Sequence, residues 1–159
     1  MSPLPHVPAG RKGSVVTSIR ILVVDDHEFV RRHICTLLST APDLNVVGQA
    51  SGGYEAVDKA QEHQPNVVLL DIGLPELNGL LAAPLIKKVA PNAEVLFVTS
   101  HQDVFFVREA FGAGARGFLS KDDIAAELIC AVRQVYSRRK FVSKNLRAVP
   151  GVPAGEAAL

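Results

Sequence analysis

The sequence predicts an α/β fold, a three-layer sandwich in which a parallel sheet of five strands lies between two layers of helices. Short apolar runs rich in Val, Ile and Leu alternate along the chain with longer segments whose apolar residues recur every three or four positions. Such alternation favours parallel pairing through right-handed crossovers, which place helices on both faces of the sheet. Apolar runs without an alternating polar face are typical of strands buried on both sides.

Length and composition are those of one globular domain with a buried core. The chain has 159 residues, of which 48% are hydrophobic and 21% charged, and its formal net charge of +1 gives no argument for nucleic acid as a partner. No apolar run has the length of a membrane span, and the N-terminus lacks the apolar core of a signal peptide. Cys35 and Cys130 fall in predicted helices without metal-ligand spacing. Reduced thiols and a cytoplasmic location are therefore expected.

The first half of the fold is predicted to begin after a flexible tail, residues 1–18, which holds three prolines and shows no period. Ile19–Val24 is the first strand, because it is apolar apart from one arginine. Residues 28–39 form a helix with apolar residues along one face, and a proline soon after it prevents its extension. Residues 45–50 are less apolar, as is usual for an edge strand, and 54–63 form the second helix.

The middle of the chain supplies a buried strand and a helix with two possible starts. Val67–Leu70 is a continuous apolar run, followed by Asp71 and a turn-rich loop. The helix after this loop ends near Val89. Pro84 lies inside it and should either kink the helix or mark its true first turn. Glu94–Thr99 is the fourth strand.

The last predicted elements are a helix over residues 103–111, a short strand over 116–120 and a helix over 123–138. Asp122 is expected to cap the last helix at its N-terminus. The basic residues 138–140 are expected to interact with the dipole of this helix, an interpretation that we prefer to nucleic-acid binding.

These elements divide the chain into three parts. Residues 19–140 form the predicted domain, which lies between the N-terminal tail and residues 141–159. From Asn145 onward the sequence is rich in Pro, Ala and Gly. The last part is therefore predicted to be a tail or the remnant of a linker.

Polar residues stand at the carboxyl ends of four predicted strands. Asp25 and Asp26 follow the first strand, Asp71 follows the third, Thr99 ends the fourth and Lys121 follows the fifth. Because parallel strands end at the same edge of a sheet, these side chains should converge in one crevice. Asp71 alone could equally be a turn residue, but its predicted neighbours favour a site.

This combination of residues fits phosphoryl transfer onto a carboxylate. Three close carboxylates repel one another, and a hard divalent cation such as Mg²⁺, or Mn²⁺ in its place, relieves that repulsion. A lysine supplies a positive charge of the kind used against phosphate, and a threonine supplies a hydroxyl donor. A carboxylate nucleophile with these neighbours has what acceptance of a phosphoryl group requires.

Four stretches resemble the receiver domain of two-component response regulators. They are ILVVDDH at residues 21–27, NVVLLDIGLPELNG at 66–79, VLFVTS at 95–100 and AFGAGARGFLSK at 110–121. The resemblance extends over residues 20–137 and is specific, because all four stretches occur in this order. It implies the flavodoxin-like fold, with parallel strands in the order 2-1-3-4-5.

The resemblance implies a role for each residue of the predicted site. Asp71 would accept the phosphoryl group and, with Asp26, would ligate Mg²⁺ directly. Asp25 would contact the metal mostly through water, and the backbone carbonyl of Gly73 would complete the protein ligands. Lys121 would pair with Asp71 and then with the phosphoryl group.

The resemblance also implies a switch and a partner. Thr99 would move toward a phosphoryl oxygen, and Phe118, three residues before Lys121, would turn inward behind it. A histidine kinase or a histidine phosphotransfer protein would supply the phosphoryl group. The downstream partner is not implied.

The DDH stretch, the GFLSK ending and the absence of proline after Lys121 are similar to the NarL/FixJ-type subgroup, so a trans Lys121–Asp122 bond is expected. Members usually continue into a helix-turn-helix domain, and residues 141–143 resemble the start of the linker to it. The chain is thus either a natural single-domain regulator or one cut before its output domain, and DNA binding is not predicted from it. The subgroup also implies a homodimer formed through the first or last helix.

Three positions, Gly73, His101 and Phe105, depart from the usual pattern of the family. Gly73 has no side chain over the site, which should leave the phosphoryl group open to water. His101, two residues after Thr99, holds the other position that tunes dephosphorylation, although it could equally be an exposed loop histidine. Elsewhere, Phe105 is expected to be exposed, with a docking role as the less favoured interpretation.

Three other functions are weighed against phosphoryl acceptance. A degenerate receiver could serve as a protein-interaction scaffold, but the complete set of site residues argues against it. A hydrolase with an aspartate nucleophile commonly needs an acid–base carboxylate two residues on, where Gly73 stands. A flavin-binding module needs a hydroxyl- and glycine-rich loop after the first strand, where this chain has DDHEFV. We therefore expect a signalling phosphoacceptor that catalyses only its own phosphorylation and dephosphorylation.

Overall fold

The computed structural model of the chain describes residues 18–156, so the predicted N-terminal tail lies almost wholly outside the described residues. The strands are β1 (Ile19–Val24), β2 (Leu44–Ala50), β3 (Val67–Leu70), β4 (Glu94–Thr99), β5 (Gly117–Ser120) and β6 (Phe141–Val142). The helices are α1 (Glu28–Leu38), α2 (Gly53–His63), α3 (Gly79–Val89), α4 (Val104–Gly112) and α5 (Ile124–Tyr136), with 3₁₀ turns at Lys121–Asp123 and Lys144–Leu146. Within this described part, no helix is long and apolar enough to cross a bilayer.

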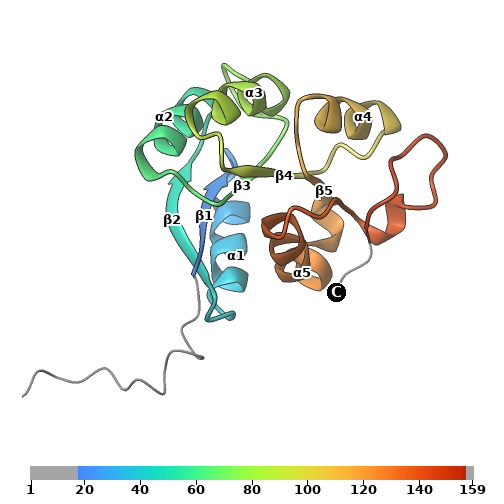
Figure 1. Cartoon of the computed structure of the whole chain (residues 1–159), viewed down its shortest axis with the longest axis horizontal. Coiled ribbons are helices and arrows are strands. Elements are labelled where there is room, and N and C mark those ends of the chain that lie inside the picture. Colours follow the sequence, from blue (N-terminus) through green and yellow to red (C-terminus); the bar gives the residue numbers. More distant parts are fainter. Residues whose placement is uncertain (1–17, 157–159) are drawn as a thin grey trace, which may run out of the picture.

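In residues 18–156, a parallel sheet of six strands forms the centre of the fold, in the order β2-β1-β3-β4-β5-β6. Helices α1 and α5 cover one face, and α2, α3 and α4 cover the other (Figure 1). The predicted layers and the predicted order of the first five strands are confirmed. The prediction of only five strands was wrong, because the structure adds β6 beside β5.

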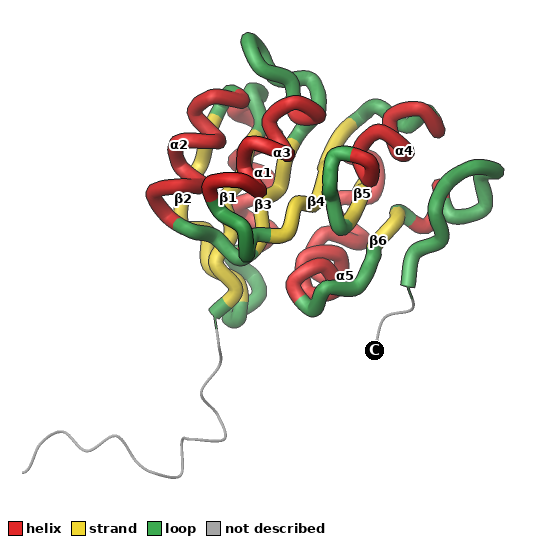
Figure 2. Tube along the Cα trace, turned by 45° about the horizontal axis from the view of Figure 1, so that its top comes forward, coloured by secondary structure: helices red, strands yellow, loops and turns green. Residues whose placement is uncertain are grey.

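The added strand β6 comes from the segment that was predicted to be a linker remnant or tail. Phe141 lies opposite Gly117 and Val142 lies opposite Phe118 in the register of the two strands. Figure 2 shows β6 at the end of the sheet, beside β5. A strand of two residues is too short to show a hydrophobic period, so it could not be predicted from the residue pattern.

Each strand of the sheet contributes to both halves of the core, because successive residues point to opposite faces. In β1, Leu22 packs with residues of α2 and α3, whereas Ile21 packs with residues of α1 and α5. In β5, Phe118 and Leu119 divide in the same way. Burial on both faces explains why these strands are continuous apolar runs.

Helix α3 begins at Gly79, so a start near Pro84 was the wrong alternative, and the helix runs through the proline. Asn78 caps it, since its Oδ1 accepts a hydrogen bond from the backbone N–H of Leu81 at 3.1 Å. Gly79 is required by packing: a Cβ there would lie 2.1 Å from the carbonyl oxygen of Asp71. The first residue of α3 thus packs tightly against the backbone of Asp71.

The two ends of α5 differ from the prediction. Asp122 does not cap the helix; instead Ser120 Oγ accepts a hydrogen bond from the backbone N–H of Asp122 at 3.2 Å, and α5 starts at Ile124. The helix ends at Tyr136, so the basic residues 138–140 follow directly after its C-cap residue Ser137, and their interaction with the helix dipole stays a prediction. The described peptide bonds are all trans, including the one after Lys121, as predicted.

Candidate functional site

The carboxyl ends of β1 and β3 bring two aspartates together. Leu70 lies beside Val24 in the register of these strands, and the backbone N–H of Asp71 donates to the carbonyl of Val24 at 3.1 Å. The next residue of each strand therefore carries its carboxylate into the same place. Asp25 is 1% exposed and Asp71 4% exposed, so Asp71 is not the solvated turn residue that was the alternative.

Lys121 joins these two carboxylates from the end of β5. Its Nζ lies 2.8 Å from Oδ2 of Asp25 and 2.8 Å from Oδ2 of Asp71. Burial alone would lower the pKa of Lys121, but its hydrogen bonds to both carboxylates and the attraction of their charges raise that pKa above its ordinary value. The lysine is therefore a fixed positive charge within the site at any ordinary pH.

His27 is a site residue for which no role was predicted from the sequence. Its Nδ1 lies 3.2 Å from Oδ1 of Asp25 and 3.1 Å from Oδ1 of Asp26, and its backbone N–H donates to Oδ1 of Asp25 at 2.8 Å. Arg31 fixes the same loop, because its Nη1 donates to the carbonyl oxygen of Asp25 at 2.7 Å. The DDH stretch was a signal for His27, but only the structure shows which groups the imidazole faces.

One ligand atom from each of four side chains could surround a metal ion at this edge of the sheet. The side chains are those of Asp25, Asp26, His27 and Asp71, and the atoms lie within 4.8 Å of one another. The three carboxylates outnumber the single lysine, which leaves excess negative charge that suits a divalent cation. The side chains of Asp25, Asp26, Asp71 and Lys121 thus lie together at one edge of the sheet.

Thr99 and Phe118, the predicted switch residues, are both completely buried at 0% exposure. Thr99 ends β4 opposite Ser120 of β5, the residue just before Lys121. Its Oγ1 accepts a hydrogen bond from the backbone N–H of His101 at 3.2 Å. Thr99 therefore lies beside the residue that precedes Lys121, and its side chain is hydrogen-bonded to the loop that carries His101.

Gly73 and His101 are brought together at the rim of the site. A Cβ on Gly73 would lie 3.5 Å from Nε2 of His101. The imidazole also packs on Phe106, with ring centroids 4.7 Å apart. His101 is an exposed loop histidine, and it also faces the position where a side chain is missing. Phe105 is 62% exposed, as predicted.

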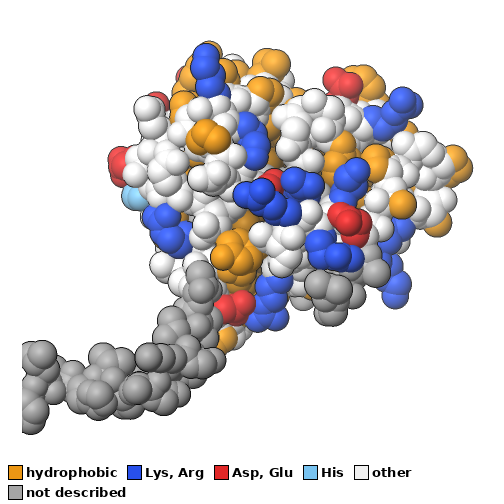
Figure 3. Space-filling view, in the orientation of Figure 1, with side chains coloured by type: hydrophobic (Ala, Val, Ile, Leu, Met, Phe, Trp, Pro, Cys, Tyr) orange, Lys and Arg blue, Asp and Glu red, His pale blue; other side chains and the backbone are white. Residues whose placement is uncertain are grey.

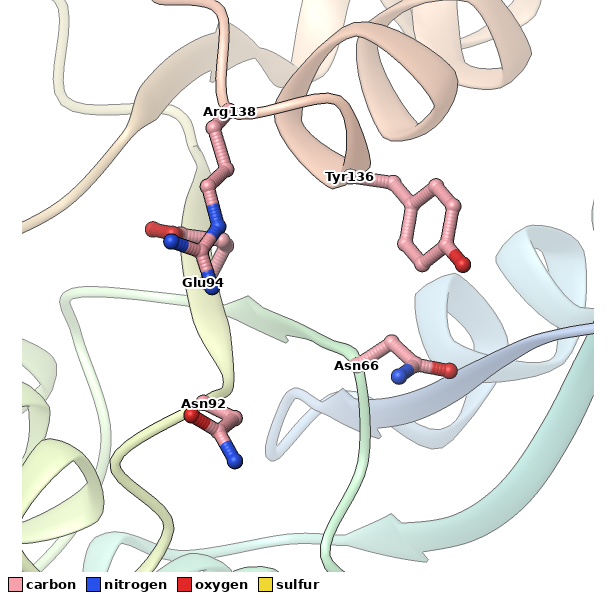
Figure 4. A pocket seen from close by; sticks show the side chains of 5 residues that line it. All are labelled: Asn66, Asn92, Glu94, Tyr136 and Arg138. Atoms are coloured by element: carbon pink, nitrogen blue, oxygen red, sulfur yellow. The ribbon is translucent and has the colours of Figure 1, made fainter.

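A second polar pocket lies at the opposite edge of the sheet, where β3 and β4 begin. It measures about 330 Å³ and is lined by Asn66, Asn92, Glu94, Tyr136 and Arg138 (Figure 4). Its carboxylate, that of Glu94, lies 3.3 Å from Arg116 and 3.9 Å from Lys87. Lys and Arg side chains also predominate over acidic ones on the face seen in Figure 3. This pocket has no cluster of carboxylates, so it does not compete as a metal site.

Comparison with known proteins shows which family this chain is similar to. A family model for the response regulator receiver domain matches residues 21–133 of this chain. Response regulator GacA of Pseudomonas viridiflava is 38% identical over 128 residues, which are 80% of this chain and 60% of that protein. The chain thus spans about 60% of the length of the curated relatives it matches.

Solved structures give the same result. A LuxR-family two-component response regulator from Aurantimonas sp. SI85-9A1 superimposes with a TM-score of 0.78 at 33% identity, over 81% of this chain and 92% of that one. The signal receiver domain of NarL from Mycobacterium tuberculosis superimposes with a TM-score of 0.72 at 32% identity, over 76% of this chain and 97% of that one. Both likenesses agree with the family and subgroup that the sequence resembles.

Proposed function

The chain belongs to the response regulator receiver family, and from this premise we propose that Asp71 accepts a phosphoryl group in a two-component signalling pathway. The observation that carries the proposal is the position of Asp71 at the end of β3, with Lys121 Nζ 2.8 Å from its carboxylate. A histidine kinase or a histidine phosphotransfer protein is the proposed donor. The chain would then be a signalling phosphoacceptor and not an enzyme with turnover on a separate substrate.

In the proposed reaction, a carboxylate oxygen of Asp71 attacks the phosphorus atom of a phosphohistidine. A P–O bond forms to Asp71 as the P–N bond breaks, and the electrons of that bond stay on the donor nitrogen. Lys121, whose Nζ contacts the carboxylates of Asp25 and Asp71, then pairs with the negatively charged phosphoryl oxygens. The Thr99 hydroxyl is available at the neighbouring strand end.

The donor set fits Mg²⁺, with Mn²⁺ as a substitute, because carboxylate oxygens are the ligands that such hard cations prefer. We assign Asp26 and Asp71 as direct ligands, Asp25 as a ligand through water and the carbonyl of Gly73 as the remaining protein contact. When bound, the metal supplies positive charge that reduces repulsion between the carboxylate and the incoming phosphoryl group. The family resemblance supports this assignment, and the closeness of the three carboxylates is consistent with it.

The proposed switch consists of Thr99 and Phe118. A phosphoryl group adds about −1.5 to −2 units of charge beside Asp71 and offers strong acceptor oxygens. In the structure, the hydroxyl oxygen of Thr99 accepts a hydrogen bond from the backbone N–H of His101 at 3.2 Å, which leaves the hydroxyl proton to be donated to a phosphoryl oxygen. Phosphorylation would thus shift an equilibrium between two arrangements of Thr99, Phe118 and the loop that carries His101.

The test is incubation of the chain with Mg²⁺ and acetyl phosphate, followed by intact mass measurement. The wild type should gain the mass of one phosphoryl group, and Asp71→Asn should not. Asp58→Asn is the matched control, because Asp58 is an exposed residue of α2 outside the site and should leave phosphorylation unchanged. A wild-type chain that gains no phosphoryl group would contradict the proposal and leave the scaffold function in its place.

A further inference from the structure

β6 lies along the outer edge of β5, and the chain that follows it to Glu156 forms a loop at that end of the sheet (Figures 1 and 2). Leu146 is buried at 5% exposure, and Val149 and Val152 pack against the half of the core that contains Phe118. The segment predicted as a tail therefore contributes to the core of the domain.

Polar contacts fix the same segment to α5. Glu127 of α5 accepts a hydrogen bond from the backbone N–H of Lys144 at 3.0 Å and lies 3.5 Å from Arg147. Arg147 in turn donates through Nε to the carbonyl of Val142 at 2.7 Å. The segment is thus held from the helix side as well as by the strand.

Ser143, directly after β6, hydrogen-bonds to β5 through both its backbone and its side chain. Its backbone N–H donates to the carbonyl of Phe118 at 3.0 Å, and its Oγ accepts from the backbone N–H of Ser120 at 2.6 Å. Ser120 and Ser143 are both 0% exposed. A side-chain hydroxyl therefore satisfies the N–H of a strand residue that is fully buried.

The hydrogen bond between Ser120 and Ser143 lies next to the acidic site. Ser120 lies directly before Lys121 and opposite Thr99 in the sheet, and Phe118 lies two residues earlier on the same strand. Any loosening of β5 at Ser120 displaces the backbone from which the lysine reaches Asp25 and Asp71. Displacements of about 1 Å at groups distant from the chemistry can lower rates strongly.

We infer that Ser143 is a positioning residue for Lys121, and that the docked segment after β6 is therefore needed for efficient phosphorylation of Asp71. The observation that supports this role is the buried hydrogen bond from the backbone N–H of Ser120 to Ser143 Oγ. The inference rests on the proposed function, since it concerns the rate at which the same aspartate is phosphorylated.

The experiment compares Ser143→Ala with Ser143→Thr, which keeps the hydroxyl, and with Ser39→Ala as the control. Ser39 is exposed, and its hydroxyl donates only to the carbonyl of Thr36 in α1. The readouts are hydrogen exchange of the Ser120 amide and the initial rate of phosphorylation by acetyl phosphate with Mg²⁺. Both are measured on the full chain.

For Ser143→Ala, the Ser120 amide should exchange about tenfold faster or more, and phosphorylation should be about tenfold slower. Ser143→Thr should restore most of both, and Ser39→Ala should match the wild type. If Ser143→Ala fails to fold, Glu127→Ala loosens the segment from the helix side and should slow phosphorylation in the same direction.

Faster exchange of Ser120 with an unchanged phosphorylation rate would overturn the inference and leave Ser143 a purely structural residue. That outcome leaves the proposed function intact, because the wild type would still be phosphorylated. A wild type without phosphorylation would instead overturn the proposed function, and the positioning role with it.

Discussion

Gly73 and His101 face each other at the rim of the acidic site: a Cβ on Gly73 would lie 3.5 Å from His101 Nε2 and would meet no other neighbour within 4 Å. There is thus room for a side chain at residue 73, and its first contact would be the imidazole. The two positions named from the sequence as candidates to tune dephosphorylation are spatial neighbours.

Gly73→Asn and Gly73→Met should slow the loss of phosphate from Asp71 several-fold, because a side chain there excludes water from the acyl phosphate. The measurement is the decay of phosphorylated chain, followed by intact mass after removal of the phosphodonor. Gly52→Asn is the control, since a Cβ at Gly52 also meets no atom within 4 Å but lies at the start of α2. If the phosphorylated wild type and all three variants decay at the same rate, residue 73 does not determine the lifetime of the phosphorylated state.

Lys121→Met should destabilise the chain in metal-free buffer and abolish efficient phosphorylation. Removal of the lysine leaves the buried carboxylates of Asp25 and Asp71 without their shared cation, at a cost of about 2–3 kcal/mol for this partly solvated site. Urea denaturation measures the loss. Wild-type stability in the variant would show that the two carboxylates need no compensation.

Mg²⁺ should stabilise the wild-type chain by mass action, since the folded state holds the carboxylates together and the unfolded state does not. The gain in melting temperature should grow with Mg²⁺ concentration and should shrink in Asp26→Asn. Asp26 suits this test because its side chain is 31% exposed, so its replacement does not disturb the core. A melting temperature independent of Mg²⁺ would argue against the assigned ligand set.

Asp43→Asn should remove a pH-dependent contribution to stability that lies far from the site. Two hydrogen bonds from Arg133, of 3.0 and 2.9 Å, hold the pKa of Asp43 below its usual value. Because the folded pKa is lowered, the contribution is complete above the ordinary aspartate value of about 3.9 and is lost as the pH falls through the folded pKa. The pair is partly exposed, so the contribution should be at most about 1 kcal/mol.

The measurement for Asp43 is the free energy of unfolding of wild type and variant between neutral pH and acid. Their difference should be constant near neutrality and should vanish in acid. A difference that persists at low pH would mean that packing, and not the ion pair, stabilises this contact.

The acidic site was predictable from the sequence because strand ends in a parallel sheet share one edge. That rule alone brings Asp71 and Lys121 together, although 50 residues separate them in the chain. Two features were not predictable for physical reasons. β6 is too short to show a period, and the hydroxyl of Ser143 acts through a backbone hydrogen bond that no residue pattern marks.

Gly79→Ala tests the link between the start of α3 and the site. A Cβ at this position would lie 2.1 Å from the carbonyl oxygen of Asp71 and 3.0 Å from Cα of Ile72, so the backbone that carries the acceptor must move. We expect a loss of about 1–3 kcal/mol in the free energy of unfolding, as for overpacked cores. Phosphorylation by acetyl phosphate should also slow, because the displaced backbone moves the carboxylate of Asp71 away from Lys121.

The control for Gly79→Ala is Gly112→Ala, since a Cβ at Gly112, the last residue of α4, meets no atom within 4 Å. Alanine there should leave phosphorylation unchanged and should alter stability by no more than about 1 kcal/mol, the usual difference between glycine and alanine in a helix. A Gly79→Ala chain as stable and as readily phosphorylated as Gly112→Ala would show that the contact between α3 and Asp71 is not close enough to constrain the acceptor. The expected result, slower phosphorylation in Gly79→Ala alone, would make this glycine a steric determinant of where the acceptor carboxylate lies.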